Sequence, residues 1–187
     1  YQHSLGYSAE ENHEKPKNIR SDKEKSLARI QLMTKEGEFQ AAKKLYQEAL
    51  KQFPSDEQLN THYFLFNLAT RSSSAEQTNT DFDQYMNHLL RSRQKDKAYQ
   101  NYKKACSALP SYLPKTPDLR FSLAKICYEH GAPKLTIRLL NGLHKAFPHY
   151  LHLIEAYNFL AQTLEDIPNS DKQIQQCLKL ITILEKL

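Results

Sequence analysis

The feature that most constrains the fold is a spacing of three residue types that occurs twice and is echoed a third time. The same offsets of four and then eight residues hold in Ala42, Tyr46 and Pro54, in Ala98, Tyr102 and Pro110, and in Thr136, Leu140 and Pro148. A pattern that returns along a chain indicates repeated supersecondary units, and such repeats decide the whole architecture.

The composition agrees with a helical protein. The chain has 187 residues, of which 40% are hydrophobic and only 4 are glycine. Leu, Ala, Lys, Glu and Gln, which have high helix propensity, dominate the sequence. A chain of this length can bury a substantial core. We therefore predict an all-α domain of about nine helices.

Apolar periodicity and helix-ending residues place the expected helices. They cover residues 22–36, 38–53, 55–70, 81–93, 96–109, 117–130, 133–147, 150–164 and 169–187. The polar run 71–80 is expected to be a loop, because its serines and threonines compete for backbone hydrogen bonds. The segment 111–117, with two prolines, is expected to be a stiff connector.

The recurring spacing resembles the second half of the tetratricopeptide repeat, which pairs two antiparallel helices in about 34 residues. The matching segments are approximately 23–56, 79–112 and 117–150. In the clearest copy, the first-helix positions are filled by Phe82, Tyr85, Met86 and Leu89, and the second-helix positions by Ala98, Tyr102, Ala105 and Pro110. The resemblance implies stacked helical hairpins in a right-handed superhelix and a scaffold that binds proteins. An unrelated helical bundle is the alternative.

The repeats are irregular. The prolines that end them, Pro54, Pro110 and Pro148, are not separated by 34 residues, and an extra helix at 56–70 is expected between the first two copies. We interpret 1–21 as a polar linker or disordered arm and 22–187 as the repeat domain, which ends in a helix pair at 150–187.

In tetratricopeptide domains the first helices line a concave groove. Carried over by position, the candidate groove residues are Asp83, Gln84, Asn87, Arg91, Phe121, Ser122, Lys125 and Glu129. The lysine and asparagine clamp that binds the terminal carboxylate of chaperone tails in some members is absent, because Gln84 and Ser122 are among the residues at its positions. The resemblance therefore implies a bound extended peptide or helix.

A basic segment offers a second interpretation. The segment from Arg91 to Lys104 contains six basic residues, one acidic residue and two tyrosines. The basic residues are Arg91, Arg93, Lys95, Lys97, Lys103 and Lys104. Basic patches with stacking aromatics are typical of nucleic-acid binding. Attraction to an anionic membrane surface and a plain solvated helix edge are the alternatives, and the last is favoured.

No catalytic motif is present in the sequence, so we predict a protein without enzymatic activity, cofactor or bound metal. The histidines at 144, 149 and 152 are interpreted as surface residues near a turn rather than as metal ligands. Three widely spaced cysteines, Cys106, Cys127 and Cys177, are expected to be buried free thiols, which favours a reducing compartment.

The last helix is apolar on two faces, whereas the outer face of a terminal repeat is usually polar. We therefore expect that the second apolar face is covered, either by more chain after Leu187 or by a second copy of the protein in a homodimer. No apolar run approaches the roughly 18 residues of a membrane span. We expect a cytoplasmic location. A further hypothesis, motivated by a first residue other than methionine, is that the chain is the soluble segment of a membrane-anchored protein.

Overall fold

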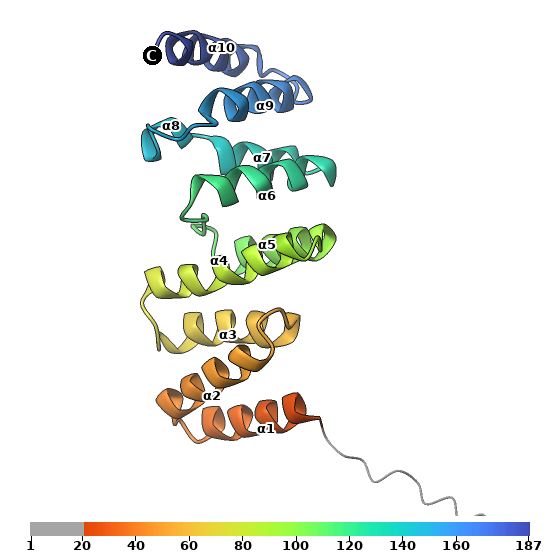
Figure 1. The fold of residues 1–187 in the computed structure, drawn as a ribbon, viewed down its shortest axis with the longest axis vertical. Helices are drawn as coiled ribbons and strands as arrows, with labels where there is room; N and C mark the ends of the chain where they lie inside the picture. Colours follow the sequence, from red (N-terminus) through yellow and green to blue (C-terminus); the bar gives the residue numbers. More distant parts are fainter. Residues whose placement is uncertain (1–20) are drawn as a thin grey trace, which may run out of the picture.

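A computed structural model describes residues 21–187, and within that range the chain is all helical, as the sequence predicts. The helices stack in chain order along the long axis of the molecule (Figure 1). They are α1 (Asp22–Lys35), α2 (Phe39–Gln52), α3 (Glu57–Thr70), α4 (Ala75–Arg91), α5 (Lys95–Ala108), α6 (Pro117–Glu129), α7 (Pro133–Leu140), α8 (Leu143–Ala146), α9 (Leu153–Glu165) and α10 (Asp171–Glu185).

The hairpins α1–α2, α4–α5 and α6–α7 are closed by the same turn. A residue in the left-handed conformation follows the first helix of each pair: Gly37 at φ 79°, Arg93 at φ 57° and Gly131 at φ 71°. In the first pair, the N–H of Gly37 donates to the carbonyl of Thr34, and the N–H of Glu38 donates to that of Met33. Residues 89–94 and 127–132 make the same two bonds. This Schellman motif satisfies the last carbonyls of the first helix and reverses the chain.

The small residue of the recurring spacing lies five positions after each left-handed residue. Ala42, Ala98 and Thr136 have no exposed surface at all. In the third pair, the hydroxyl of Thr136 donates to the carbonyl of Ala124 across the hairpin at 3.1 Å. A small side chain at this position therefore lets the two helices of a pair approach closely.

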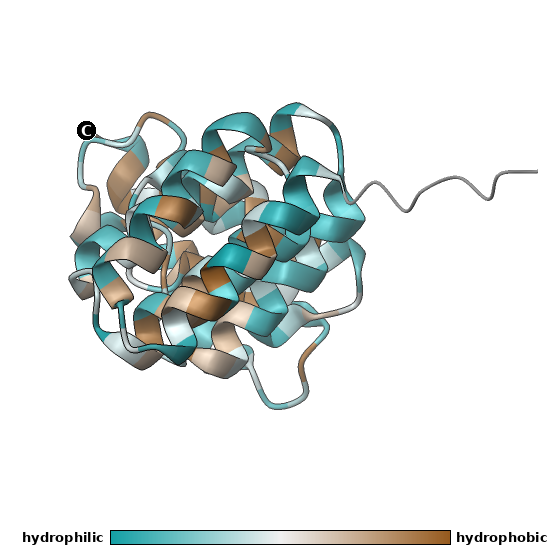
Figure 2. Cartoon of the chain, turned by 90° about the horizontal axis from the view of Figure 1, so that it is seen from below, coloured by the Kyte–Doolittle hydropathy of each residue, from teal (hydrophilic) through white to brown (hydrophobic). Residues whose placement is uncertain are grey.

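Helix α3 contributes side chains to two hydrophobic cores, one on each of two sides. On one side Tyr63 and Phe66 pack on Tyr46 of α2, with ring centroids 5.2 and 5.1 Å apart. On the other side Phe64 packs on Phe82 of α4 at 4.7 Å. Figure 2 shows hydrophobic and hydrophilic residues interleaved along the helices, as expected for helices with one packed and one solvated face.

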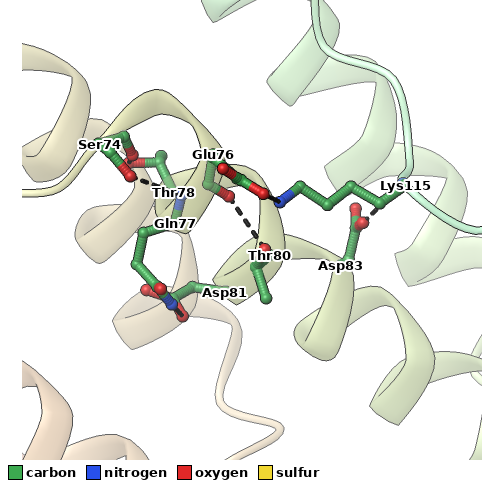
Figure 3. Close-up of polar contacts among 8 residues, drawn as sticks. All are labelled: Ser74, Glu76, Gln77, Thr78, Thr80, Asp81, Asp83 and Lys115. Carbon is green, nitrogen blue, oxygen red and sulfur yellow. Dashed lines mark hydrogen bonds and ion pairs between the residues drawn. The ribbon is translucent and has the colours of Figure 1, made fainter.

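The expected loop at 71–80 is wrong, because α4 begins at Ala75. The side chain of Ser74 caps the helix by accepting from the N–H of Gln77 at 3.0 Å. The hydroxyls of Thr78 and Thr80 donate to carbonyls four residues earlier, so they are satisfied within the helix (Figure 3). Hydroxyl residues at a helix start stabilise the first turn, whereas the sequence prediction treated them as helix breakers.

The single helix expected at 133–147 is also wrong. It is broken at Gly142, which has φ 70° and separates α7 from α8. The Asn-Gly pair at 141–142, a turn signal that the prediction passed over, coincides with the break. Buried Arg120 donates from Nε to the carbonyl of Leu139 and from Nη2 to that of Asn141, so its guanidinium satisfies carbonyls at the end of α7.

The polar arm proposed at 1–21 lies outside the described residues except for Ser21. This serine is the N-cap of α1 and forms a capping box with Glu24. Within residues 21–187, no helix is long and apolar enough to cross a membrane. The three cysteines are free and buried, as predicted.

Replacing Arg93 with glycine should raise the free energy of unfolding by about 0.5–1 kcal/mol, because a side chain costs energy at positive φ. The matched control is Gly37→Ala, where no atom of residues 21–187 would lie within 4 Å of the added Cβ, so its loss of stability reports the backbone conformation alone. Urea unfolding of both variants measures the effect. A lower stability of Arg93→Gly would contradict the shared-turn description.

His130 links the second hairpin to the third. Its Nδ1 lies 2.8 Å from the carbonyl of Ile126 and its Nε2 lies 2.7 Å from the carboxylate of Asp96, while the ring stacks on Tyr99 at 4.4 Å. Both neighbouring oxygens are acceptors, and only the protonated ring has two N–H donors. The contact with Ile126, followed by that with Asp96, therefore raises the pKa of His130.

This raised pKa predicts that protonated His130 stabilises the fold. The contribution is complete below the unfolded pKa of about 6.5 and is lost as the pH rises through the higher folded pKa. The melting temperature of the wild type minus that of His130→Gln should therefore fall as the pH rises above about 6.5. Burial lowers the pKa of His144, so this residue changes stability with pH in the opposite direction. Because both proteins contain His144, its effect cancels when the two melting temperatures are subtracted. Parallel pH curves for the two proteins would refute the assignment.

Candidate functional site

The structure divides the eight candidate groove residues into two classes. Asp83 and Phe121 are buried, whereas the others are exposed or half-buried on α4 and α6. The accessible residues are Gln84, Asn87, Arg91, Ser122, Lys125 and Glu129. These two first helices contact each other directly.

Asp83 anchors the connector between α5 and α6. Its carboxylate accepts from the hydroxyl of Tyr112 at 2.5 Å and from the backbone N–H of Lys115 at 2.9 Å. The ammonium of Lys115 also pairs with Glu76 at 3.1 Å, so the connector is held at two places along α4 (Figure 3). Burial raises the pKa of Asp83, and the hydrogen bonds from Tyr112 and Lys115 oppose this shift. Asp83 therefore has a structural role, which is to hold this connector against α4.

Phe121 packs between α6 and α9. Its ring meets Phe159 edge to face at 6.0 Å. The ammonium of Lys125 lies 4.1 Å from the centroid of the Phe121 ring, a cation–π contact that holds the lysine side chain at the surface. Thus Phe121 supports Lys125 from below.

A cleft of about 240 Å³ opens between α2, α3 and α4. The end of α2 contributes Gln47 and Lys51, and α4 contributes Asp81, Gln84 and His88. The aromatic wall consists of Tyr63, Phe64, Phe82 and Tyr85. Gln84 belongs to both the predicted groove and the cleft, so the two surfaces adjoin at this residue.

The inner side of the cleft contains polar groups of two kinds. Asn60 donates to the carbonyls of Pro54 at 3.0 Å and Asp56 at 2.7 Å. By contrast, the buried hydroxyl of Tyr85 has no hydrogen-bond partner within residues 21–187. The buried amide of Asn67 lies close to the hydroxyl of Tyr63, so it has a polar neighbour in the core. Buried polar groups are nearly always paired in proteins, so the unpaired hydroxyl marks the cleft as unusual.

Sequence reasoning missed this cleft. Asn60 and Asn67 lie seven residues apart in the helix expected at 55–70. Because seven residues are about two helical turns, both side chains lie on the same face, which is the apolar face that packs in the core. Two asparagines at core positions were the available signal, because asparagine is rarely buried.

The basic segment does not present its aromatic residues. Tyr99 and Tyr102 are buried, with Tyr99 stacked on His130, so neither can stack on a nucleic-acid base from this surface. Lys95 pairs with Glu129 at 3.9 Å and Lys104 with Glu57 at 3.6 Å, which neutralises part of the charge. Attraction of an anionic surface through the remaining basic residues stays a prediction.

The remaining candidates do not form a site. Among residues 21–187 no group of at least three His, Cys, Asp or Glu side chains could hold a metal. His144 instead contacts the hydroxyl of Tyr157, and His152 contacts Glu155. The outer face of α10 exposes Leu178 and Ile183. Self-association through that face stays a prediction.

Comparisons with known proteins do not identify a family. No family model matches the chain, and no curated protein matches it. A solved structure, that of the MamA protein, is similar at 12% sequence identity, with 84% of this chain and 86% of that chain covered. The TM-score of 0.33 is too low to carry an argument.

Replacing Asp83 with leucine should lower the free energy of unfolding by about 2 kcal/mol, because the hydroxyl of Tyr112 and the N–H of Lys115 would be left buried or half-buried without an acceptor. The control Tyr112→Phe removes one of these bonds and should cost about 1 kcal/mol. Urea unfolding measures both variants. An unchanged stability of Asp83→Leu would show that the carboxylate does not anchor the connector.

Proposed function

We propose that the chain is a non-enzymatic scaffold, an irregular member of the tetratricopeptide-like helical repeats, which binds a peptide or helix of a partner protein. The observation that carries the proposal is the set of accessible polar side chains on α4 and α6 that the core does not use. Binding residues on rigid helices lose little entropy when a partner docks, so a stack of hairpins suits this role.

The proposed contact surface contains Gln84, Asn87, Arg91, Ser122, Lys125 and Glu129. It carries both charges and neutral amides, which suits recognition of a polypeptide rather than a polyanion. The support beneath Lys125 is the ring of Phe121, which limits the freedom of the lysine before binding. A chaperone tail read by a carboxylate clamp is not the proposed ligand, because the clamp residues are missing.

The three buried free thiols support a reducing compartment such as the cytoplasm. Asp83 and Phe121 act in this proposal only as supports of the surface, since both are buried.

The proposal predicts that Lys125→Glu and Asn87→Ala weaken capture of a partner without changing the melting temperature. We expect each to reduce captured partner by about fivefold or more, in line with an interface residue worth about 1 kcal/mol. Affinity purification with quantitative mass spectrometry measures the change.

The matched control reverses charge elsewhere, at Lys103 and Lys104 on α5. This double variant should capture the partner as the wild type does. Loss of capture in the control alone would favour the basic surface, and unchanged capture in all three variants would refute the proposed contact surface.

A further inference from the structure

The break between α7 and α8 borders a second cleft, at the C-terminal end of the stack. This α7–α10 cleft has a volume of about 250 Å³ and is lined by residues of α7, α8, α9 and α10. Its apolar lining consists of Ile137, Leu160, Leu164 and Leu180, and its polar lining includes His144 and Lys145. The cleft thus combines an alkyl surface with two nitrogen-bearing side chains.

The contacts of His144, which holds no metal, fix where its ring carries a hydrogen. The backbone N–H of His144 donates to the hydroxyl oxygen of Tyr157 at 3.0 Å, and the N–H of Leu143 also lies close to this oxygen. The hydroxyl therefore uses its own hydrogen to donate to Nδ1 of His144, 2.5 Å away. A neutral imidazole has one N–H, so Nδ1 accepts and Nε2 carries the hydrogen.

The remaining N–H of His144 is open to a ligand. Burial, followed by the ammonium of Lys145, lowers the pKa of His144, so the ring is neutral at neutral pH. Nε2 is neither hydrogen-bonded to another residue within 21–187 nor fully buried, because the side chain is half-buried. His144 thus presents one hydrogen-bond donor that the fold leaves unused.

The electrostatics of the cleft favour an anion. Lys145 is exposed at its rim, and no Asp or Glu among residues 21–187 lines the cleft. A donor on His144 and an adjacent ammonium complement a group that has two acceptor oxygens and a negative charge. A carboxylate has this form, and hydrogen bonds to a charged partner are stronger than those between neutral groups.

The apolar lining and the size of the cleft define the rest of the ligand. Leu160 and Leu164 lie one turn apart on α9, and Leu180 of α10 is half-buried beside them. An alkyl chain in contact with these side chains would be withdrawn from water, which favours binding. The volume of about 250 Å³ is just below the range of roughly 300–1,000 Å³ for drug-sized ligands, so a small molecule is expected.

We propose that the α7–α10 cleft binds a small aliphatic monocarboxylate. Its carboxylate accepts hydrogen bonds from Nε2 of His144 and from the ammonium of Lys145. Its alkyl chain lies against Leu160, Leu164 and Leu180. No residue of the contact surface proposed on α4 and α6 lines this cleft, so the two sites are separate.

The first test is a titration of the ¹⁵N-labelled chain with hexanoate at constant ionic strength and pH 7.5. The ring nitrogens of His144 and the backbone amide of Lys145 should shift saturably. Hexanamide, which has the same shape without the charge, should bind at least about fivefold more weakly. Butanoate, which is two methylenes shorter, should bind about tenfold more weakly than hexanoate.

The second test uses matched variants. Lys145→Gln removes the charge at an exposed position and should weaken hexanoate binding about fivefold, with an unchanged melting temperature. The control Lys134→Gln makes the same change on α7 at a residue that does not line the cleft, and it should bind hexanoate as the wild type does.

A third comparison separates a free acid from the carboxyl end of a polypeptide. N-acetyl-leucine has the carbon skeleton and carboxylate of 4-methylpentanoate, with an added acetylamino group that represents a peptide bond. The proposal expects 4-methylpentanoate to bind more tightly, because the added group enlarges the ligand beyond what a small cleft accepts. Tighter binding of N-acetyl-leucine would show that the cleft reads a polypeptide end and would overturn the proposal.

The remaining outcomes are decisive in the same way. If the shifts with hexanoate do not saturate, if hexanamide or hexylamine binds as tightly as hexanoate, or if Lys145→Gln keeps full affinity, the site is not a carboxylate site. The variant Lys125→Glu should bind hexanoate normally even if it fails to capture a partner from the cell, so the two proposals fail independently.

Discussion

The Schellman turns that close three of the hairpins are the constraint on which the rest of the stack depends. Each turn satisfies the last carbonyls of one helix and fixes where the next helix begins, so the small residue five positions later is always placed at the contact between the two helices. Two of the turns use glycine, and the third accepts the cost of Arg93 at positive φ. The geometry of the pair is thus set by backbone hydrogen bonds, and the side chains adapt to it.

Between the first two of these hairpins, α3 turns a regular stack into an irregular one. Its aromatic residues serve one core on the side of α2 and another on the side of α4. Where these cores meet, the side chains are partly polar, and the cleft lies at that junction. A seam between two cores is a natural place for polar groups, because neither core can fill it completely with apolar atoms.

The connector between α5 and α6 explains why positional transfer of groove residues was only partly informative. Asp83 occupies a first-helix position, yet its carboxylate binds this connector through Tyr112 and Lys115. Arg138 of α7 also donates to the carbonyls of Pro110 and Tyr112, so the connector is held from both hairpins. A repeat pattern gives the position of a residue on its helix, but the inserted segments decide whether that position faces solvent.

The sequence by itself determined the helical class, most helix positions and the buried second-helix positions, because periodicity and propensity act over a few turns of helix. The Ser-Thr run that starts α4 was misread as a loop, and the Asn-Gly pair that ends α7 was missed. Only the tertiary structure decided that Asp83 and Phe121 are buried and that the buried hydroxyl of Tyr85 has no partner among residues 21–187. Those properties depend on contacts between residues far apart in the chain, which no local pattern encodes.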